Sequence, residues 1–218
     1  MAAQIEVESG LASFLAPIAE RLGLPLDFVE TLPPTRPENY ISVSVARSPH
    51  NQVVTYPAIT SSNRGNNRSY ELLSSDQLSA NLQSEVITRL PKEAGLSAAN
   101  FIFDSDGKLT SIFPGITRES LWTLEFSYIS HFENALRARH DLPLGSAESI
   151  LQPWYLLEFH APPYLDMVKP YLHLFAHNPR YRIVKLSEFS GYVALGGSGN
   201  LTSSAAHAVD YLEGVIDE

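Results

Sequence analysis

The sequence predicts an α+β fold, in which antiparallel, hairpin-connected strands carry packed helices. Three observations lead to this prediction. Short alternating runs rich in β-branched residues, such as ISVSVAR at 41–47, indicate strands. The DSDG run at 104–107 lies between two such runs and indicates a hairpin. Segments with apolar residues at helical spacing, such as 9–22, lie between and after the strands.

The N-terminal half of the chain is expected to contain two helices and one pair of strands. Ser9 is the expected cap of the first helix, and Asp76 is the expected cap of a second helix that ends near Pro91 and Gly95. The other segments, in order, are a helix at 9–22, a proline-rich connector at 32–37, strands at 41–47 and 53–57, and a polar loop at 60–69.

The C-terminal half is expected to begin with the hairpin and to end with a helix. Its segments are strands at 99–104 and 108–113, a long helix at 119–138, short strands at 154–160, 171–177 and 181–196, and a helix at 202–214. No segment of the chain repeats another.

Composition excludes several classes of function. The chain has 218 residues, 44% of them hydrophobic, and a formal net charge of −9. This charge, with no basic cluster, argues against nucleic acid or an anionic membrane as the partner. There is no cysteine for a disulfide or a thiolate metal site, and no apolar run long enough to span a bilayer. Without a signal-like N-terminus, a cytoplasmic location is expected.

Four stretches of the sequence, in chain order, carry a resemblance to a known family. They are ENYISVSVARSPHNQVVTYP at 38–57, the hairpin at 99–113, SHFENALRARHDLPLG at 130–145, and YLHLFAH at 171–177 with GYVALGG at 191–197. Together they resemble the second half of the ATP-grasp carboxyaminoimidazole ribonucleotide synthases. The resemblance implies a truncated ATP-grasp-like antiparallel sheet with packed helices and a small C-terminal β-rich subdomain, divided at 1–37, 38–145 and 146–218.

The resemblance also implies that the chemistry of the family is lost in this chain. The family's metal-binding glutamate falls on Asn100, its metal-facing Asn-Glu pair on Thr110 and Ser111, and its phosphate-binding pair near Glu188. Mg²⁺ prefers anionic oxygens, so an amide and two hydroxyls leave no tight site. The ATP-binding first half of the family has no counterpart in the matched stretches. We therefore expect no metal, no cofactor and no use of ATP.

The candidate site residues line the cleft that the resemblance implies. Arg47 matches the family's cleft arginine, although an ion pair with Glu38 is an equal alternative. Arg47, Glu119 and His131 form the candidate catalytic set, since an isomerisation needs mainly positioning and one acid or base. The candidate substrate-binding residues are Tyr56, Asn100, Ser111, Phe113, Arg118, Trp122 and Trp154. The aromatic members favour an apolar cleft, but they can also simply fill core volume.

Four further side chains suggest a metal site. On strands, Glu158 with His160 and His173 with His177 would each share a face, and imidazole with carboxylate suits zinc or iron. The alternative is that these histidines are only hydrogen-bonded. The resemblance implies no metal in this region.

Two classes of function are left open. The first is an ATP-independent enzyme that binds an apolar-leaning metabolite and catalyses a cyclisation, isomerisation or elimination, with specialised metabolism as its setting. The second is a non-catalytic binding or regulatory module, for which a homodimer is a possible assembly because it would cover exposed apolar surface. A residual carboxyaminoimidazole ribonucleotide synthase activity is a distant third.

Overall fold

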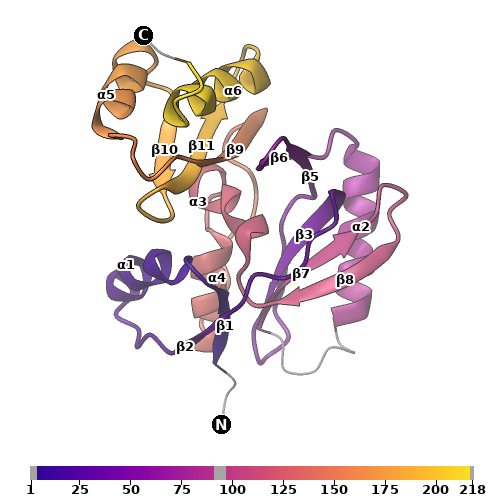
Figure 1. The fold of residues 1–218 in the computed structure, drawn as a ribbon. Helices are drawn as coiled ribbons and strands as arrows, with labels where there is room; N and C mark the ends of the chain where they lie inside the picture. Colours follow the sequence, from indigo (N-terminus) through magenta and orange to yellow (C-terminus); the bar gives the residue numbers. More distant parts are fainter. Residues whose placement is uncertain (1–3, 91–96, 217–218) are drawn as a thin grey trace. The chain divides into compact units, whose positions relative to one another are not determined.

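A computed structural model describes residues 4–90 and 97–216, so the expected helix end near Pro91 and Gly95 lies outside the described residues (Figure 1). The chain divides into two compact units. Unit 1 comprises Met1–Thr60 and Leu73–Ile150, and unit 2 comprises Ser61–Leu72 and Leu151–Glu218. Strands pair almost entirely antiparallel and carry packed helices, which confirms the α+β class. No helix within 4–90 and 97–216 is long and apolar enough to cross a membrane.

The sheet of unit 1 contains four antiparallel strands. They are β3 (Asn39–Arg47), β4 (Val53–Thr55), β7 (Ala98–Phe103) and β8 (Leu109–Pro114). Strand β3 pairs with β4 and β7, and β7 pairs with β8. The expected strand at 41–47 and the hairpin across 104–107 are therefore confirmed.

One face of this sheet forms the apolar core of unit 1. Helix α2 (Asp76–Arg89) packs against it and contributes Leu82 and Val86 to the core, and Figure 1 shows α2 beside these strands. The strands contribute the side chains Ile41, Val43, Val45, Ala99, Phe101 and Phe103. The cap of α2 is Ser75, whose hydroxyl accepts from the Leu78 amide, rather than the expected Asp76. Asp76 lies instead in the first turn, where a carboxylate favours the helix dipole.

The N-terminal segment of unit 1 forms a small βαβ element. Strands β1 (Ile5–Glu8) and β2 (Phe28–Thr31) pair in parallel, and α1 (Ala12–Leu22) connects them. The helix is confirmed, but its N-cap is Leu11 and not Ser9. Neither strand was predicted, although IEVE at 5–8 alternates apolar and polar residues as a strand does. At Gly115, φ is +73° and an added Cβ would lie 2.0 Å from the Glu6 carbonyl oxygen, so this contact of β1 requires glycine.

The prediction of a single long helix at 119–138 is wrong. The segment contains a 3-10 turn η2 (Arg118–Ser120), a short helix α3 (Trp122–Phe126) and a helix α4 (His131–Arg139). Ser127 is extended and its hydroxyl donates to the Thr123 carbonyl, while the Ser130 hydroxyl accepts from the Glu133 amide and caps α4. Local side-chain hydrogen bonds of this kind compete with a continuous helix.

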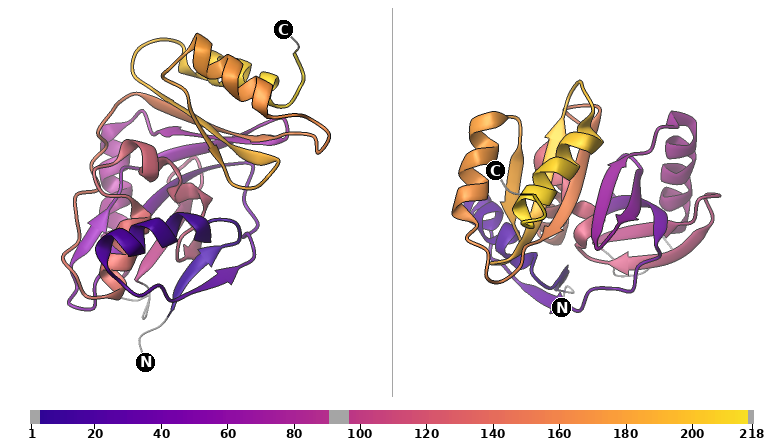
Figure 2. Two further views of the ribbon diagram at one scale, coloured as in Figure 1. Left: turned by 90° about the vertical axis from the view of Figure 1, so that its left-hand side faces the viewer. Right: turned by 45° about the horizontal axis from the view of Figure 1, so that its top comes forward.

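Unit 2 contains an antiparallel sheet covered by two helices. The strand order is β10 (Arg182–Lys185), β11 (Ser190–Gly196), β9 (Trp154–His160), β6 (Asn67–Leu72) and β5 (Ile59–Arg64), the last of which begins in unit 1. Helices α5 (Val168–His177) and α6 (Leu201–Leu212) pack beside each other (Figure 2). They enclose an apolar core with the strands, which includes Leu157, Phe159, Val193, Leu195, Leu174, Val209 and Leu212.

Two expectations for unit 2 are wrong. The polar run 60–69 is not a loop but most of a β5–β6 hairpin that turns at Gly65, where φ is +63°. Its serine side chains pair across the strands, as the Ser62 and Ser69 hydroxyls do at 3.0 Å. The segment 171–177 is helix α5 and not a strand, because its apolar residues also fit a helical spacing and Leu174 enters the core.

Candidate functional site

The second face of the unit 1 sheet carries polar side chains and is the candidate site. We call it the site face and define it by Tyr40, Ser42, Ser44, Asn100 and Phe113. Cross-strand pairing of Ser44 with Asn100, and of Asn100 with Phe113, places these residues on the side opposite α2. Asn100 lies here, at the position that the resemblance assigns to a metal-binding glutamate.

The Asn100 amide is fully engaged inside the protein. Its Nδ2 donates to the Thr117 Oγ1 at 3.0 Å and to the Ser120 Oγ at 3.2 Å, and its Oδ1 accepts from the Ser44 hydroxyl. The side chain is completely buried. Both amide hydrogens are therefore used, and the carbonyl faces a hydroxyl rather than a cleft.

His131 continues this network and lies fully buried on α4. Its Nε2 lies 2.9 Å from the Val45 carbonyl oxygen, and its Nδ1 lies 2.7 Å from the Ser120 Oγ. Because a carbonyl only accepts, Nε2 carries the proton and Nδ1 accepts from Ser120. Burial lowers the pKa of His131 to about 4. The imidazole is thus neutral near pH 7, and it ties α4 to strand β3.

Glu119 and Glu8 share the guanidinium of Arg36. Arg36 Nε lies 2.6 Å from Glu119 Oε1, and Arg36 Nη2 donates to Glu8 Oε2. Both carboxylates are buried, and Arg118 Nε lies 3.1 Å from Glu8 Oε1. Tyr40 and Thr117 hydroxyls also donate to Glu119. The cluster links β1, the proline-rich connector and η2.

The pKa values of the two carboxylates in this cluster are shifted in opposite directions. Burial alone would raise the pKa of Glu119, but the Arg36 charge and the hydroxyl donors outweigh burial, so the pKa is lowered. For Glu8, burial outweighs the attraction of Arg36 and the pKa is raised. The arrangement can hold an ionised Glu119 in place, whereas Glu8 takes up a proton more readily.

Sequence reasoning missed Arg36, Glu8 and Tyr40. Arg36 lies in the proline-rich connector, where no regular element was expected, and Glu8 ends strand β1, which was not predicted. Glu119 itself was predicted, and because it is buried in the structure its charge requires a partner, which is Arg36.

The other predicted residues of unit 1 serve mainly in packing and local hydrogen bonds. The Tyr56 hydroxyl donates to the Ile129 carbonyl oxygen at 2.9 Å, and its ring meets Trp122 edge to face at 6.1 Å. Arg47 donates to Asn51 and to the Leu90 carbonyl.

Ser111 and Phe113 lie on β8, and Trp154 lies elsewhere. Ser111 is half-buried and pairs with Ile102, whereas the Phe113 ring lies 5.8 Å from the Arg36 guanidinium carbon. Trp154 is buried on β9, in unit 2. The structure thus joins Asn100, Arg118, Glu119 and His131 to one network or its edge. Tyr56, which meets Trp122, also packs edge to face on the His131 ring at 5.4 Å.

The histidines singled out by sequence lie on helix and strand. His173 and His177 belong to α5, where their rings stack with centroids 4.1 Å apart. Buried Glu158 accepts from the Tyr70 hydroxyl, and His160 contacts Asn67. Within 4–90 and 97–216, no group of three or more His, Cys, Asp or Glu side chains could hold a metal ion.

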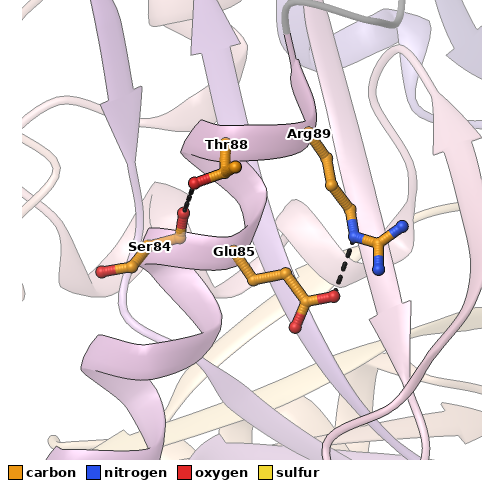
Figure 3. Close-up of a pocket in the computed structure, with 4 residues that line it drawn as sticks. All are labelled: Ser84, Glu85, Thr88 and Arg89. Atoms are coloured by element: carbon orange, nitrogen blue, oxygen red, sulfur yellow. Dashed lines mark hydrogen bonds and ion pairs between the residues drawn. The ribbon is translucent and has the colours of Figure 1, made fainter.

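A hollow of about 440 Å³ lies on the outer surface of α2 and contains none of the predicted residues (Figure 3). Its polar groups serve the helix itself, since Arg89 pairs with Glu85 at 2.8 Å and the Thr88 hydroxyl donates to the Ser84 carbonyl at 2.9 Å. The lining groups satisfy one another, so this hollow offers no convergent chemistry.

The fold and the site face together define the class of protein as one with an ATP-grasp-like fold. The structure resembles N5-carboxyaminoimidazole ribonucleotide synthetase from Thermotoga maritima, with TM-score 0.66 and 16% identity over 80% of this chain and 52% of that one. It also resembles the Aspergillus clavatus N5-carboxyaminoimidazole synthase in complex with ADP and 5-aminoimidazole ribonucleotide, with TM-score 0.65 and 18% identity over 97% and 68%.

A third similar structure is the phosphoribosylaminoimidazole carboxylase ATPase subunit of Aquifex aeolicus, with TM-score 0.61 and 16% identity over 88% of this chain and 58% of that one. No protein-family model and no curated protein matches the sequence. The chain spans about half the length of the Thermotoga structure. The resemblance inferred from the four sequence stretches is therefore confirmed as a likeness in fold.

The hydrogen bonds of Asn100 predict a clear result for Asn100→Asp. The carboxylate would lose both amide donors and leave the Thr117 and Ser120 oxygens without them, in a fully buried position. We expect a loss of about 2 kcal/mol in the free energy of unfolding, measured by urea denaturation. The exposed Asn51→Asp variant is the comparison and should change much less. Equal losses in the two variants would contradict the buried network.

Proposed function

We propose that this chain is an ATP-independent protein with an ATP-grasp-like fold, and that it binds a small organic molecule at the site face without ligase chemistry. The observation that carries the proposal is Asn100, which is buried and internally bonded at the position of a metal-binding glutamate.

The donor set does not fit a magnesium ion. Mg²⁺ and its triphosphate need carboxylate oxygens in an octahedral arrangement. Asn100 has both hydrogens engaged, and Thr110 and Ser111 supply only hydroxyls, of which the Thr110 hydroxyl donates to the Ile102 carbonyl at 3.0 Å. A cation entering here would have to break this network, and the carboxylate nearest to it, Glu119, is already paired with Arg36. This supports a function that does not depend on ATP.

The residues beside this network combine an apolar ring with polar groups, which suits a small ligand with an apolar part. Phe113 lies under Arg36, and Ser111 is half-buried beside them on the same strand. The Ser42 hydroxyl is buried and has no hydrogen-bond partner among residues 4–90 and 97–216. Binding sites commonly combine apolar walls with a few polar groups of this kind.

Of the two classes left open by the sequence, the geometry favours the non-catalytic one. His131 and Glu119 are fully buried and bonded to protein groups, and Arg47 donates to Asn51 and a carbonyl. A general acid or base must reach the substrate directly or through one water. A cyclisation or isomerisation, a setting in specialised metabolism, a homodimer and a cytoplasmic location stay predictions.

Thermal denaturation with nucleotide tests the proposal. A ligand at one hundred times its Kd adds about 2.7 kcal/mol, which raises Tm by several degrees for a chain of this size. We expect no such shift with millimolar ATP and Mg²⁺, or with AMP-PNP and Mg²⁺. The Arg89→Ala variant controls for anion binding at the surface of α2. A shift of several degrees that persists in Arg89→Ala would overturn the proposal.

A further inference from the structure

Unit 2 carries a groove that lies outside the site face and that no part of the proposed function uses. It has a volume of about 260 Å³ and runs between the start of α5 and the edge strand β10. Its lining residues are Met167, Val168, Tyr171, Leu172 and Lys185. Val168 and Leu172 are 62% and 67% exposed, although both are aliphatic. This is an apolar surface that a ligand would shield from water.

Two polar groups of the groove lack an acceptor. Lys185 places its Nζ 5.3 Å from the centroid of the Tyr171 ring and forms no ion pair with any residue that the structure describes. The Tyr171 hydroxyl is buried and has no hydrogen-bond partner within 4–90 and 97–216. Burial raises the pKa of Tyr171, so the hydroxyl stays protonated and remains a donor. A buried donor without an acceptor is costly and calls for an explanation.

We propose that this groove binds a small amphipathic carboxylate, such as a medium-chain fatty acid, and that Lys185 binds its carboxylate group while the Tyr171 ring forms part of the wall. The alkyl chain would cover Val168 and Leu172, and the carboxylate would accept from the Lys185 ammonium. A charge-assisted pair of this kind is stronger than a neutral hydrogen bond. The proposal concerns unit 2 alone and is independent of the site face.

Charge and size select this occupant over others. The chain has a net charge of −9, so an anion needs a local cation, and Lys185 supplies one beside aliphatic side chains. A cationic amphiphile would meet Lys185 with like charge. The groove is smaller than the roughly 300–1,000 Å³ of sites for drug-sized ligands, which limits the ligand to a fragment-sized molecule.

Calorimetric titration with sodium octanoate tests the proposal on the full chain. We expect saturable binding of octanoate, and weaker binding of 1-octanol and octyltrimethylammonium, which have similar tails but no carboxylate. Lys185→Met keeps the aliphatic stem and should lower octanoate affinity about tenfold without affecting 1-octanol. The matched control is Lys169→Met, which removes the same charge from α5 at a residue that does not line the groove.

Two further variants test the apolar part of the groove and the Tyr171 hydroxyl. Leu172→Asp should abolish octanoate binding, because it places a carboxylate in the apolar part of the groove. Tyr171→Phe should leave the Tm of the ligand-free protein unchanged or higher, since it removes an unsatisfied hydroxyl, and should leave octanoate binding intact, since the ring that lines the groove remains.

Three results would overturn the proposal. One is equal affinity for octanoate and 1-octanol, and another is an equal loss in Lys185→Met and Lys169→Met. The third is a dimer in sedimentation velocity that Leu172→Asp converts to a monomer, with no binding of octanoate to the unmodified protein. That third result would identify the groove as an interface between two copies of the chain.

Discussion

Replacing Arg36 by methionine is expected to lower the free energy of unfolding by about 3–5 kcal/mol, the usual cost of leaving a buried charge unpaired. Arg36 is shared by Glu8 and Glu119, and both carboxylate side chains are 0% exposed. Without the guanidinium, the two carboxylates would lie close together and away from water. Denaturation in urea, followed by circular dichroism, measures this loss.

The pH dependence of the loss in Arg36→Met follows from the same contacts. Without Arg36, the pKa of both Glu8 and Glu119 would rise in the folded state, since burial then acts unopposed by that charge. A carboxyl whose folded pKa is raised contributes stability at low pH and loses it as pH rises through the folded pKa. The difference between Arg36→Met and the unmodified protein should therefore be largest near pH 7 and shrink toward pH 4.

Arg21→Met is the matched control for Arg36→Met. Arg21 also pairs with a carboxylate, Glu133, but its own side chain is 60% exposed. Ion pairs with a solvent-exposed member of this kind contribute roughly 0–1 kcal/mol to the free energy of unfolding. If Arg36→Met costs no more than Arg21→Met, the shared guanidinium does not stabilise unit 1. Adding Glu119→Gln to Arg36→Met should recover part of the loss, because it removes the Glu119 charge that Arg36 no longer neutralises, while Arg118 still pairs with Glu8.

The stability of the protein is expected to fall by about 3 kcal/mol between pH 6.5 and pH 4 because of His131 alone. Its pKa is about 4 in the folded protein, against 6.5 for an unperturbed histidine. Over this interval the unfolded chain binds a proton at His131 and the folded chain does not, so stability is lost as pH falls. Each unit of pKa difference corresponds to about 1.4 kcal/mol.

Urea denaturation at a series of pH values checks this effect. Other groups also titrate over the range, so the informative quantity is the difference in slope between the unmodified protein and His131→Gln. The variant should lose the His131 contribution and show a flatter profile. His50→Gln is the control, because the His50 side chain is 82% exposed and faces Asp141. Equal slopes in His131→Gln and the unmodified protein would show that the imidazole is not held neutral.

The sequence predicted the parts of the fold that depend on local patterns. Strand β3 shows strict alternation, and the β7–β8 hairpin is marked by the DSDG run at 104–107. Predictions were wrong where one sequence pattern fits both a strand and a helix. The segment 171–177 alternates like a strand, but its apolar residues also fit a helical spacing that places Leu174 on the buried side. The segment forms a helix because it packs against α6 in the core of unit 2.

The candidate site could be predicted only in part. The resemblance identified Asn100, but the hydrogen bonds that occupy both of its amide hydrogens depend on Thr117 and Ser120. These two residues lie 17 and 20 positions further along the chain and are brought close by η2. Arg36 and Glu119 are 83 residues apart, so no local signal connects them. Contacts such as that of Arg36 with Glu119 form only when the connector and η2 meet, so no local pattern reveals the partners of Glu119.

The most direct test of ATP independence is an NMR titration that follows the side-chain amide of Asn100. In the structure this amide donates to Thr117 and Ser120 and is completely buried. We predict that its two proton resonances exchange slowly with water and do not move when ATP and Mg²⁺ are added to millimolar concentration. Mn²⁺ with ATP should likewise broaden them no more than the exposed amide of Asn51. A saturable shift or a selective broadening at Asn100 would place a metal–nucleotide complex at the site face and contradict the account.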